Sequence, residues 1–117
     1  MFLPEIKDYD TLYRSFRWDI PERFNIATVS CDVWAEKEPM RPAIFEVGRD
    51  ESVTVTSYAT LRLMSNRLAE ALVRAGIGRG DRVAVLAPQS RHVPAAHLAV
   101  YRMGGIAVPL AVLFGVD

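Results

Sequence analysis

The sequence predicts an α/β protein with N-terminal helices, a β-hairpin and a parallel βαβ unit. Two short apolar runs bounded by turn residues, 83–86 and 106–108, have the pattern of buried strands. A segment with helical signals lies between them, from Ser90 to Met103. Because a strand, a helix and a strand at this spacing nearly always form a right-handed crossover, we expect the two strands to be parallel neighbours.

Composition limits the class of protein. The 117 residues suffice for one domain or a part of one, and 14 Lys and Arg side chains balance 14 Asp and Glu side chains. This balance gives no sign of a nucleic-acid or anionic-membrane partner. The start of the chain has charges where a signal peptide is apolar, and no apolar run reaches the roughly 18 residues of a membrane helix. With one cysteine and no possible internal disulfide, we expect a cytoplasmic protein.

Residues 1–23 are expected to form a helical extension. An apolar stripe recurs at helical spacing on Tyr9, Leu12, Tyr13 and Phe16. We expect this stripe to pack on the body of the protein. A helix lying on a membrane surface is the alternative, which the acidic residues on the polar face weaken.

A second helix is expected from Asn25, a good N-cap residue, to about Lys37, before Pro39. Its predicted buried face consists of Ile26, Val29, Val33 and Trp34. Cys31 lies off this stripe. Because nothing in the sequence places a His partner beside it, we interpret it as a small buried or half-buried thiol and not as a nucleophile.

Two strand-like runs, 42–47 and 53–56, flank the charged turn 48–52 and predict a β-hairpin. Its polar, exposed positions are predicted to be Glu46, Thr54 and Thr56. Thr56 or Ser57 then caps the clearest helix of the chain, which runs to Ala75 with Gly76 beyond it. The predicted buried face of this helix is Leu61, Met64, Leu68, Leu72 and Ala75.

The glycine-rich segment 76–81 is interpreted as a helix stop and a turn. Its glycines precede the strand, whereas those of a phosphate-binding loop follow one, and their spacing matches no nucleotide fingerprint. The tripeptide Arg79-Gly80-Asp81 is read as part of the same turn. A row of arginines on the preceding helix is read as a solvated face.

The crossover helix, with Ser90 as its expected cap, is apolar on nearly all sides and is interrupted chiefly by His97 and Arg102. We expect it to be covered on most sides. His92 and His97 are five residues apart and do not share a helix face, which disfavours a metal pair. The sequence contains no recognisable catalytic triad, carboxylate pair or metal cluster.

Four segments, in order, resemble the adenylate-forming enzymes, which include acyl-CoA synthetases, luciferases and the adenylation domains of peptide synthetases. Phe24-Asn-Ile-Ala27 with Cys31-Asp32 is similar to an opening motif of acetyl- and medium-chain acyl-CoA synthetases. The segment 56–61 resembles the T-Y-x-E-L motif, with Thr60 in place of Glu. A third segment resembles the family's G-D-x-V-x-x-x-x-P strand and reads Gly78-Arg-Gly-Asp-Arg-Val-Ala-Val-Leu-Ala-Pro88. The fourth segment, 101–110, resembles the family's A-G-x-x-x-V-P-L motif.

The resemblance implies an ATP-dependent acid–thiol ligase that uses Mg²⁺ and transfers an acyl group from an adenylate to coenzyme A. The family's phosphate loop and C-terminal lysine motif are not among the 117 residues. We therefore expect residues 24–117 to be the N-terminal portion of the AMP-binding domain, truncated before the phosphate loop. This implies no catalytic residue, no activity and no bound cofactor for the chain alone. The resemblance also places Leu113, Phe114 and Gly115 in a loop near coenzyme A.

Two expectations concern partners. The apolar helix 95–103 and strand 106–108 are expected to leave an uncovered patch, so that the chain associates with itself as a two-fold dimer. The alternative function is a free-standing α/β binding or oligomerisation module without catalysis, and an unrelated nucleotide-binding α/β protein is a third reading. A phosphate loop in a continuing reading frame would favour the enzyme, and a native stop after Asp117 would favour the module.

Overall fold

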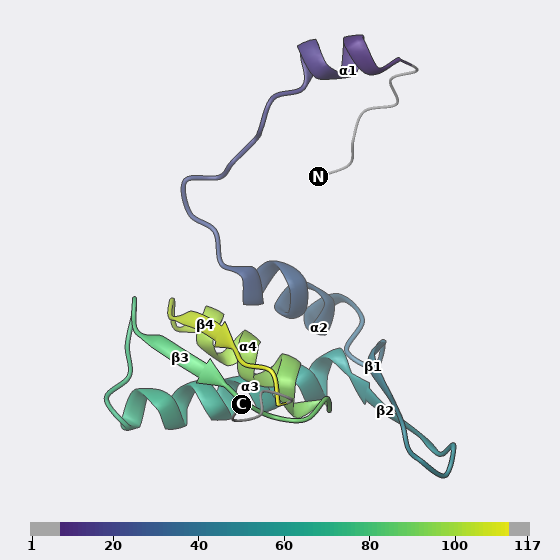
Figure 1. Cartoon of the computed structure of the whole chain (residues 1–117), viewed down its shortest axis with the longest axis vertical. Coiled ribbons are helices and arrows are strands. Elements are labelled where there is room, and N and C mark those ends of the chain that lie inside the picture. The colour runs from purple at the N-terminus through teal and green to yellow at the C-terminus, as the bar shows by residue number, and fades with distance from the viewer. Residues whose placement is uncertain (1–7, 113–117) are drawn as a thin grey trace, which may run out of the picture.

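The structure, a computed structural model, describes residues 8–112 (Figure 1). Its elements in order are α1 (Tyr9–Ser15), the π-helical turn η1 (Thr28–Asp32), α2 (Val33–Lys37), β1 (Pro42–Val47), β2 (Val53–Ser57), α3 (Tyr58–Arg74), β3 (Arg82–Val85), α4 (His92–Arg102) and β4 (Ile106–Pro109). These elements confirm the predicted α/β class.

The parallel βαβ unit is confirmed. Strands β3 and β4 are parallel, with Val83 opposite Ala107, and α4 connects them. The expectation that the strand at 83–86 is buried on both faces is wrong, since Val83 and Val85 are half-buried while Arg82 and Ala84 are exposed. The strand at 106–108, expected to be buried, is half-buried at Ala107 and Val108 and exposed at Ile106. Within residues 8–112 the helical layer of α3 and α4 covers one side of this sheet only.

The hairpin is also confirmed, with β1 and β2 antiparallel around the predicted turn. Thr54 is exposed as predicted, but the prediction is wrong for Thr56 and Glu46. Thr56 is 2% exposed, and the Glu46 carboxylate accepts a hydrogen bond of 3.1 Å from the Arg91 backbone N–H. The face that carries these residues also carries Ile44, which packs against the core. The outward face is apolar and consists of Phe45, Val47, Val53 and Val55.

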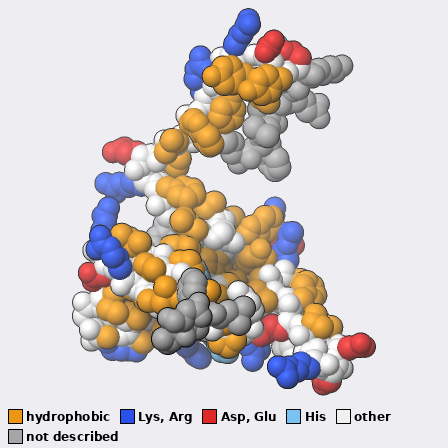
Figure 2. All heavy atoms as spheres, viewed as in Figure 1, with side chains coloured by type: hydrophobic (Ala, Val, Ile, Leu, Met, Phe, Trp, Pro, Cys, Tyr) orange, Lys and Arg blue, Asp and Glu red, His pale blue; other side chains and the backbone are white. Residues whose placement is uncertain are grey.

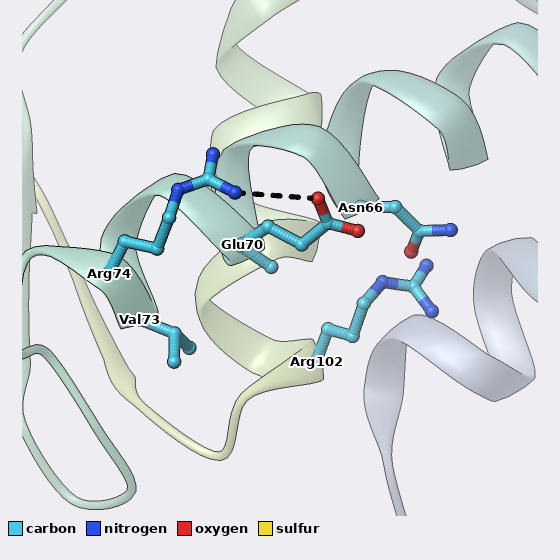
Figure 3. A pocket seen from close by; sticks show the side chains of 6 residues that line it. Asn66, Glu70, Val73, Arg74 and Arg102 are labelled. Carbon is cyan, nitrogen blue, oxygen red and sulfur yellow. Dashed lines mark ion pairs between the residues drawn. The ribbon is translucent and has the colours of Figure 1, made fainter.

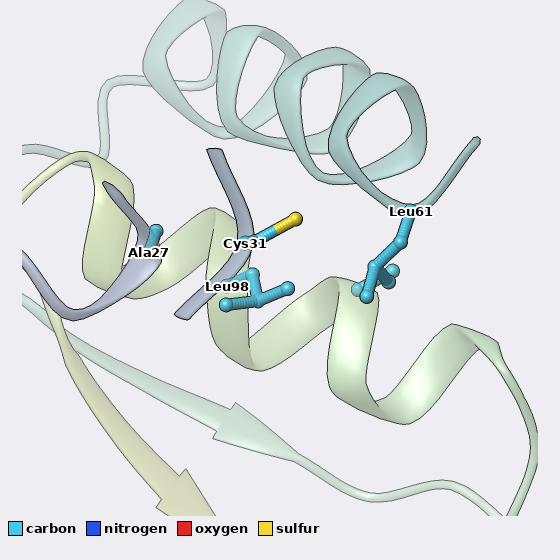
Figure 4. Packing of buried hydrophobic residues seen from close by; sticks show 5 residues of the cluster. Ala27, Cys31, Leu61 and Leu98 are labelled. Carbon is cyan, nitrogen blue, oxygen red and sulfur yellow. The ribbon is translucent and has the colours of Figure 1, made fainter. Parts of the chain in front are cut away.

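The core lies where η1, α3 and α4 meet. Its central cluster is shown in Figure 4 and comprises Ala27, Cys31, Leu61, Ala95 and Leu98. Leu61 is buried as predicted, but Ala75 is exposed and the other deeply buried positions of α3 are Ser65 and Ala69. Together with Ala99 on α4, these small residues let the two helices approach closely.

The helical segment after Asn25 is confirmed, but its predicted buried face is wrong. The buried positions are Ala27, Cys31 and Ala35, spaced four residues apart. The predicted positions Ile26, Val29 and Val33 are 47%, 50% and 48% exposed, and Trp34 is half-buried. A π-helical turn has more residues per turn than an α-helix, so a spacing of four keeps the small side chains aligned toward α3 and α4.

Two of the three predicted N-caps are confirmed. The Asn25 side-chain oxygen accepts from the Ala27 N–H at 3.0 Å, and the Ser57 hydroxyl accepts from the Thr60 N–H at 3.3 Å. Ser90 is not the cap of α4, because the capping position is Arg91, which makes no side-chain capping bond. The Ser90 hydroxyl instead accepts a long bond of 3.4 Å from the His92 N–H, so the helix begins one residue later than expected.

The glycine-rich turn is confirmed. Its backbone is closed by Asp81, whose carboxylate accepts from the Gly78 N–H at 2.7 Å. Gly80 has a φ of 85°, a left-handed conformation that favours glycine, and its N–H donates to the Gly104 carbonyl at 3.0 Å. The turn thus ties the start of β3 to the loop before β4.

Helix α1 has no buried residue, and Figure 1 shows it standing apart from the rest of the chain. Tyr9 and Tyr13 are 74% and 73% exposed, so the expectation that its stripe packs on the body of this chain is wrong. An extended segment joins α1 to Asn25. Within residues 8–112, no helix combines the length and the apolar character needed to cross a bilayer.

Candidate functional site

Among residues 8–112, a dense cluster of polar contacts surrounds Arg102, the last residue of α4. Its guanidinium makes two hydrogen bonds to the Asp32 carboxylate, of 2.6 and 2.8 Å. The same group donates to the Ser65 hydroxyl at 3.2 Å, and Ser65 donates to the Arg62 carbonyl. The side chains of Arg102 and Asp32 are only 21% and 15% exposed. The two-pronged ion pair therefore connects η1 to α4, and the bond to Ser65 adds α3.

Asn25 makes a second link to the end of α4. Its side-chain N–H group donates to the carbonyls of Tyr101 at 3.0 Å and Arg102 at 3.3 Å. The same amide caps the following helix through its oxygen. The Asn25 side chain thus caps the N-terminus of the helical segment that follows it and donates hydrogen bonds to C-terminal carbonyls of α4.

The chemistry of this cluster is structural. The hydrogen bonds from Arg102 to Asp32 raise the pKa of the arginine above its ordinary value, and burial opposes this only in part. The guanidinium stays charged and its charge is matched by one carboxylate. The cluster holds three helices together and offers neither a general base nor a nucleophile.

Two hollows flank Arg102. One, of about 440 Å³, is lined by side chains of α3 and Arg102; Figure 3 shows Glu70 and Arg74 as an ion pair of 3.9 Å at its rim. The other, of about 770 Å³, is a more polar groove lined by Glu22, Arg23, Phe24, Asn25, Arg79, Arg102, Met103 and Gly104. Arginine side chains at these walls can donate hydrogen bonds to an anionic group, but they supply no reacting atom.

Cys31 is 1% exposed and lies between Ala27 and Leu61 (Figure 4). Burial, followed by the negative charge of Asp32, raises the pKa of its thiol. The thiol is therefore protonated at neutral pH, which confirms the interpretation of Cys31 as a buried structural cysteine.

We expect Cys31 to react with iodoacetamide at about pH 8 more than about tenfold more slowly in the folded chain than after unfolding in urea. A Val73→Cys variant provides the internal control, because position 73 on α3 is 56% exposed. Mass spectrometry after timed quenching distinguishes the two thiols. Equal rates at both positions in the folded chain would contradict the buried, protonated thiol.

The two histidines lie in different surroundings. His92 is exposed at the start of α4, whereas His97 is half-buried with its Nδ1 3.3 Å from the Tyr101 hydroxyl. Among residues 8–112, no three His, Cys, Asp or Glu side chains come together in a way that could hold a metal ion. The predicted loop residues Leu113, Phe114 and Gly115 lie outside the described residues.

The four family-like segments interlock in space. Asn25 and Asp32, from the first segment, bond to Tyr101 and Arg102 in the last one. The segments 78–88 and 101–110 form the adjacent strands β3 and β4, where the Ile106 N–H donates to the Asp81 carbonyl at 2.8 Å. The segment 56–61 begins α3, which packs on η1 and α4. The motifs therefore share one structural role, which is to build this folding unit.

The sequence alone did not reveal the partnership of Asp32, Ser65 and Arg102. One signal was available, since Arg102 is one of the few polar residues on an apolar helix. A charge at such a position needs a partner when the helix is buried. The identity of that partner, 70 residues earlier in the chain, depends on the packing of η1 against α4.

Comparison with known proteins defines the class. The family model described as AMP-binding enzyme matches residues 31–117. The chain is 31% identical over 108 residues to the mitochondrial acyl-coenzyme A synthetase ACSM3 of Homo sapiens, which is 87% of this chain and 18% of that protein. It is 32% identical over 90 residues to acetyl-coenzyme A synthetase 1 of Candida albicans, covering 76% of this chain and 13% of that protein.

A solved structure agrees with these matches. The acyl-CoA synthetase of Brucella canis has a TM-score of 0.72 and 34% sequence identity, over 79% of this chain and 17% of that one. The chain belongs to the family of AMP-binding enzymes, and its relatives include acyl-CoA synthetases. It spans less than a fifth of the length of each of these relatives, which fits the expectation that it corresponds to one part of such an enzyme.

Proposed function

We propose that this chain is the N-terminal part of an ATP-dependent acyl-CoA synthetase. The whole enzyme would convert a carboxylic acid, such as a fatty acid, with ATP and coenzyme A into acyl-CoA, AMP and pyrophosphate. The observation that carries the proposal is the interlocking of the four family-like segments in one folding unit that resembles acyl-CoA synthetases.

In this proposal the chain contributes scaffold and no chemistry. Residues 8–112 bring together no carboxylate set for Mg²⁺, so we derive no step through ATP or the metal from them. The chain alone is proposed to be inactive and to bind no cofactor, whereas the whole enzyme would use ATP, Mg²⁺ and coenzyme A. We keep Leu113, Phe114 and Gly115 as a proposed loop near coenzyme A.

Two further assignments belong to the same proposal. Residues 1–23 are proposed to be a helical extension and residues 24–117 the first portion of the AMP-binding domain. The extended link before Asn25 supports a division close to this point, because the body of the fold begins there. We also propose a cytoplasmic location, to be checked by imaging the protein at its native level.

A second candidate function is a free-standing binding or oligomerisation module without catalysis. Exposed apolar side chains favour it, since the outward face of the hairpin carries Phe45 and Val47 at 63% and 72% exposure. Such surfaces commonly mark sites of protein association. The two candidates differ in whether the chain takes part in adenylate formation.

A chimera tests the enzymatic proposal. Residues 31–117 replace the matching segment of the Brucella canis acyl-CoA synthetase, and ATP–pyrophosphate exchange and acyl-CoA formation are measured. We expect the chimera to retain activity and the 117-residue chain alone to show none. The matched control is the same chimera with Arg102→Ala, which should lose activity together with thermal stability. A well-folded chimera without any exchange activity would contradict the proposal, as would exchange by the chain alone.

We also propose that the chain in isolation associates with itself. The helix expected to supply the contact does not, because Ala95, Leu98, Ala99 and Val100 are buried inside the fold. The strand expected to be part of the patch is in part exposed, with Ile106 at 47% and Leu110 beyond it at 42%, and further apolar exposure lies on the hairpin, on α1 and on η1 with α2. Light scattering should give a mass above the 13.1 kDa of one chain at micromolar concentration, and a monomer at all concentrations would contradict self-association.

A further inference from the structure

An apolar hollow of about 260 Å³ lies beside β3. The residues that line it, none of which belongs to β4, are Leu68 and Leu72 of α3, residues 83–87, and Ala96 and Val100 of α4. Leu68 and Leu72 are predicted from the sequence to be buried, but in the structure they are only half-buried. Because all the lining side chains are apolar, the hollow fits further apolar side chains better than ordered water.

β3 has a free edge beside this hollow. Within residues 8–112 its strand partner is β4 alone. The Val85 carbonyl accepts from the Leu110 N–H at 3.0 Å, so the backbone groups of Val85 point toward β4. Since these groups alternate in direction along a strand, the N–H and C=O of Ala84 point to the opposite edge. That edge is bare in the part of the chain that the structure describes.

The helical layer is wider than the sheet that it covers. α4 packs on both strands, whereas α3 packs beside α4 and borders the hollow. Two helices packed side by side cover roughly 20 Å, which is the width of about four strands. The described part of the sheet has two strands. The helices therefore leave room for at least one more strand, and the hollow places that room next to β3.

The side chains of β3 fit a strand inside a sheet better than a strand at its edge. Residues 83–87 include no charge and no proline, which are the features that commonly protect an edge strand. Ala84 and Ile106, on the face away from the helices, are also apolar and exposed. Figure 2 shows apolar side chains over the part of the molecule where β3 and β4 lie in Figure 1. Parallel strands that are apolar on both faces are typical of the covered interior of a larger sheet.

The length of the relatives indicates the source of the missing strand. The chain spans less than a fifth of each relative named above, so under the proposed function most of the polypeptide lies outside these 117 residues. A second copy of the chain fits the edge less well. In a two-fold pair the β3 edges would meet antiparallel with both helical layers on one side of the sheet, and the two α3 helices would compete for the same space.

We propose that a strand from the remainder of the polypeptide pairs with the free edge of β3, and that its side chains fill the hollow against Leu68 and Leu72. This inference rests on the proposed function and names one contact between this chain and the rest of the enzyme. The contact is a strand addition, in which main-chain hydrogen bonds hold the added strand and alternate side chains enter the hollow.

Hydrogen exchange at single amides tests the added strand, by comparison of the 117-residue chain with the native polypeptide that contains it. The Ala84 N–H should exchange at least about a hundredfold more slowly in the native polypeptide, because a partner strand protects it. The Ile106 N–H is the matched control and should be slow in both proteins, because it donates to the Asp81 carbonyl at 2.8 Å.

Two results of this experiment would overturn the proposal. One is an equal exchange rate of the Ala84 N–H in the two proteins. The other is protection of the Ala84 N–H in the isolated chain that rises with chain concentration, because a second copy would then occupy the edge of β3.

Proline substitution gives an independent readout. A proline is tolerated where the lost N–H points away from the neighbouring strand, so Ala84→Pro should leave the thermal midpoint of the isolated chain almost unchanged. In the native polypeptide the same substitution removes a bond to the added strand and should lower the midpoint by several degrees. Val85→Pro is the matched control and should lower the midpoint of both proteins. An unchanged midpoint for Ala84→Pro in the native polypeptide would count against the added strand.

Failure of this inference is distinguishable from failure of the proposed function. A native polypeptide of 13.1 kDa would contradict both. A longer polypeptide that protects the Ala84 N–H but forms no acyl-CoA would contradict the proposed function and support the added strand. A longer polypeptide that forms acyl-CoA and leaves the Ala84 N–H unprotected would contradict the added strand alone.

Discussion

Leu61→Ala is expected to lower the free energy of unfolding by about 3 kcal/mol, a large fraction of the stability of a small domain. Leu61 is 5% exposed and lies in the cluster where η1, α3 and α4 meet (Figure 4). Its neighbours Ala27 and Ala95 are too small to fill the space that the truncated side chain leaves. Urea unfolding followed by circular dichroism measures the change.

Leu63→Ala is the matched control for this substitution. Leu63 lies on the same helix two residues later and is 49% exposed. Its truncation removes the same atoms without a cavity, so we expect a loss below about 1 kcal/mol. Equal losses for the two variants would mean that the cluster at Leu61 is not the core of the isolated chain.

Arg102→Met is expected to destabilise the chain by about 3 kcal/mol, because it leaves the largely buried Asp32 carboxylate without its partner. The substitution keeps the volume and the backbone contacts of Asn25, so the loss reports on the guanidinium. Adding Asp32→Leu removes the stranded charge. We expect the double variant to regain about 2 kcal/mol of the loss.

The exposed ion pair of Arg62 and Glu36 provides the comparison. Its atoms are 3.4 Å apart, but the side chains are 34% and 73% exposed. Arg62→Met should therefore cost less than about 1 kcal/mol by the same unfolding assay. A loss for Arg102→Met that is no larger than this would contradict the role of the Arg102 cluster as the link between three helices.

Element type could be predicted from the sequence, because local signals decide it. The hairpin turn, the Ser57 cap and the glycine-rich turn before β3 act within a few residues, and each is present in the structure. The parallel pairing of β3 and β4 could also be predicted, because two strands joined by a helix of this length nearly always form a parallel crossover unit. These features are sufficient to predict the α/β class.

Burial faces could not be predicted with the same success. The large apolar residues Ile26, Val29 and Val33 were expected inside, but the small residues Ala27, Cys31 and Ala35 lie there. Close helix packing selects small side chains, and the π-helical turn changes the periodicity that the sequence pattern assumes. The inward face of the hairpin was predicted wrongly for another reason. The sequence does not show that Glu46 bonds to Arg91, and this contact turns Glu46 toward the body of the fold.

The polar cluster had the weakest sequence signal. Asp32, Ser65 and Arg102 come from three helices, and only packing reveals that they meet. The resemblance to adenylate-forming enzymes named the segments that contain Asp32 and Arg102 without giving their contact. The structure explains why these segments belong together, because Asn25 and Asp32 both hold the end of α4.

The intact mass of this protein, as its native cell produces it, tests the central claim most directly. The claim is that the 117 residues are the scaffold portion of an acyl-CoA synthetase. It predicts a polypeptide several times heavier than 13.1 kDa that contains this sequence and forms acyl-CoA. A native polypeptide of 13.1 kDa would contradict the enzymatic account and favour the binding or oligomerisation module.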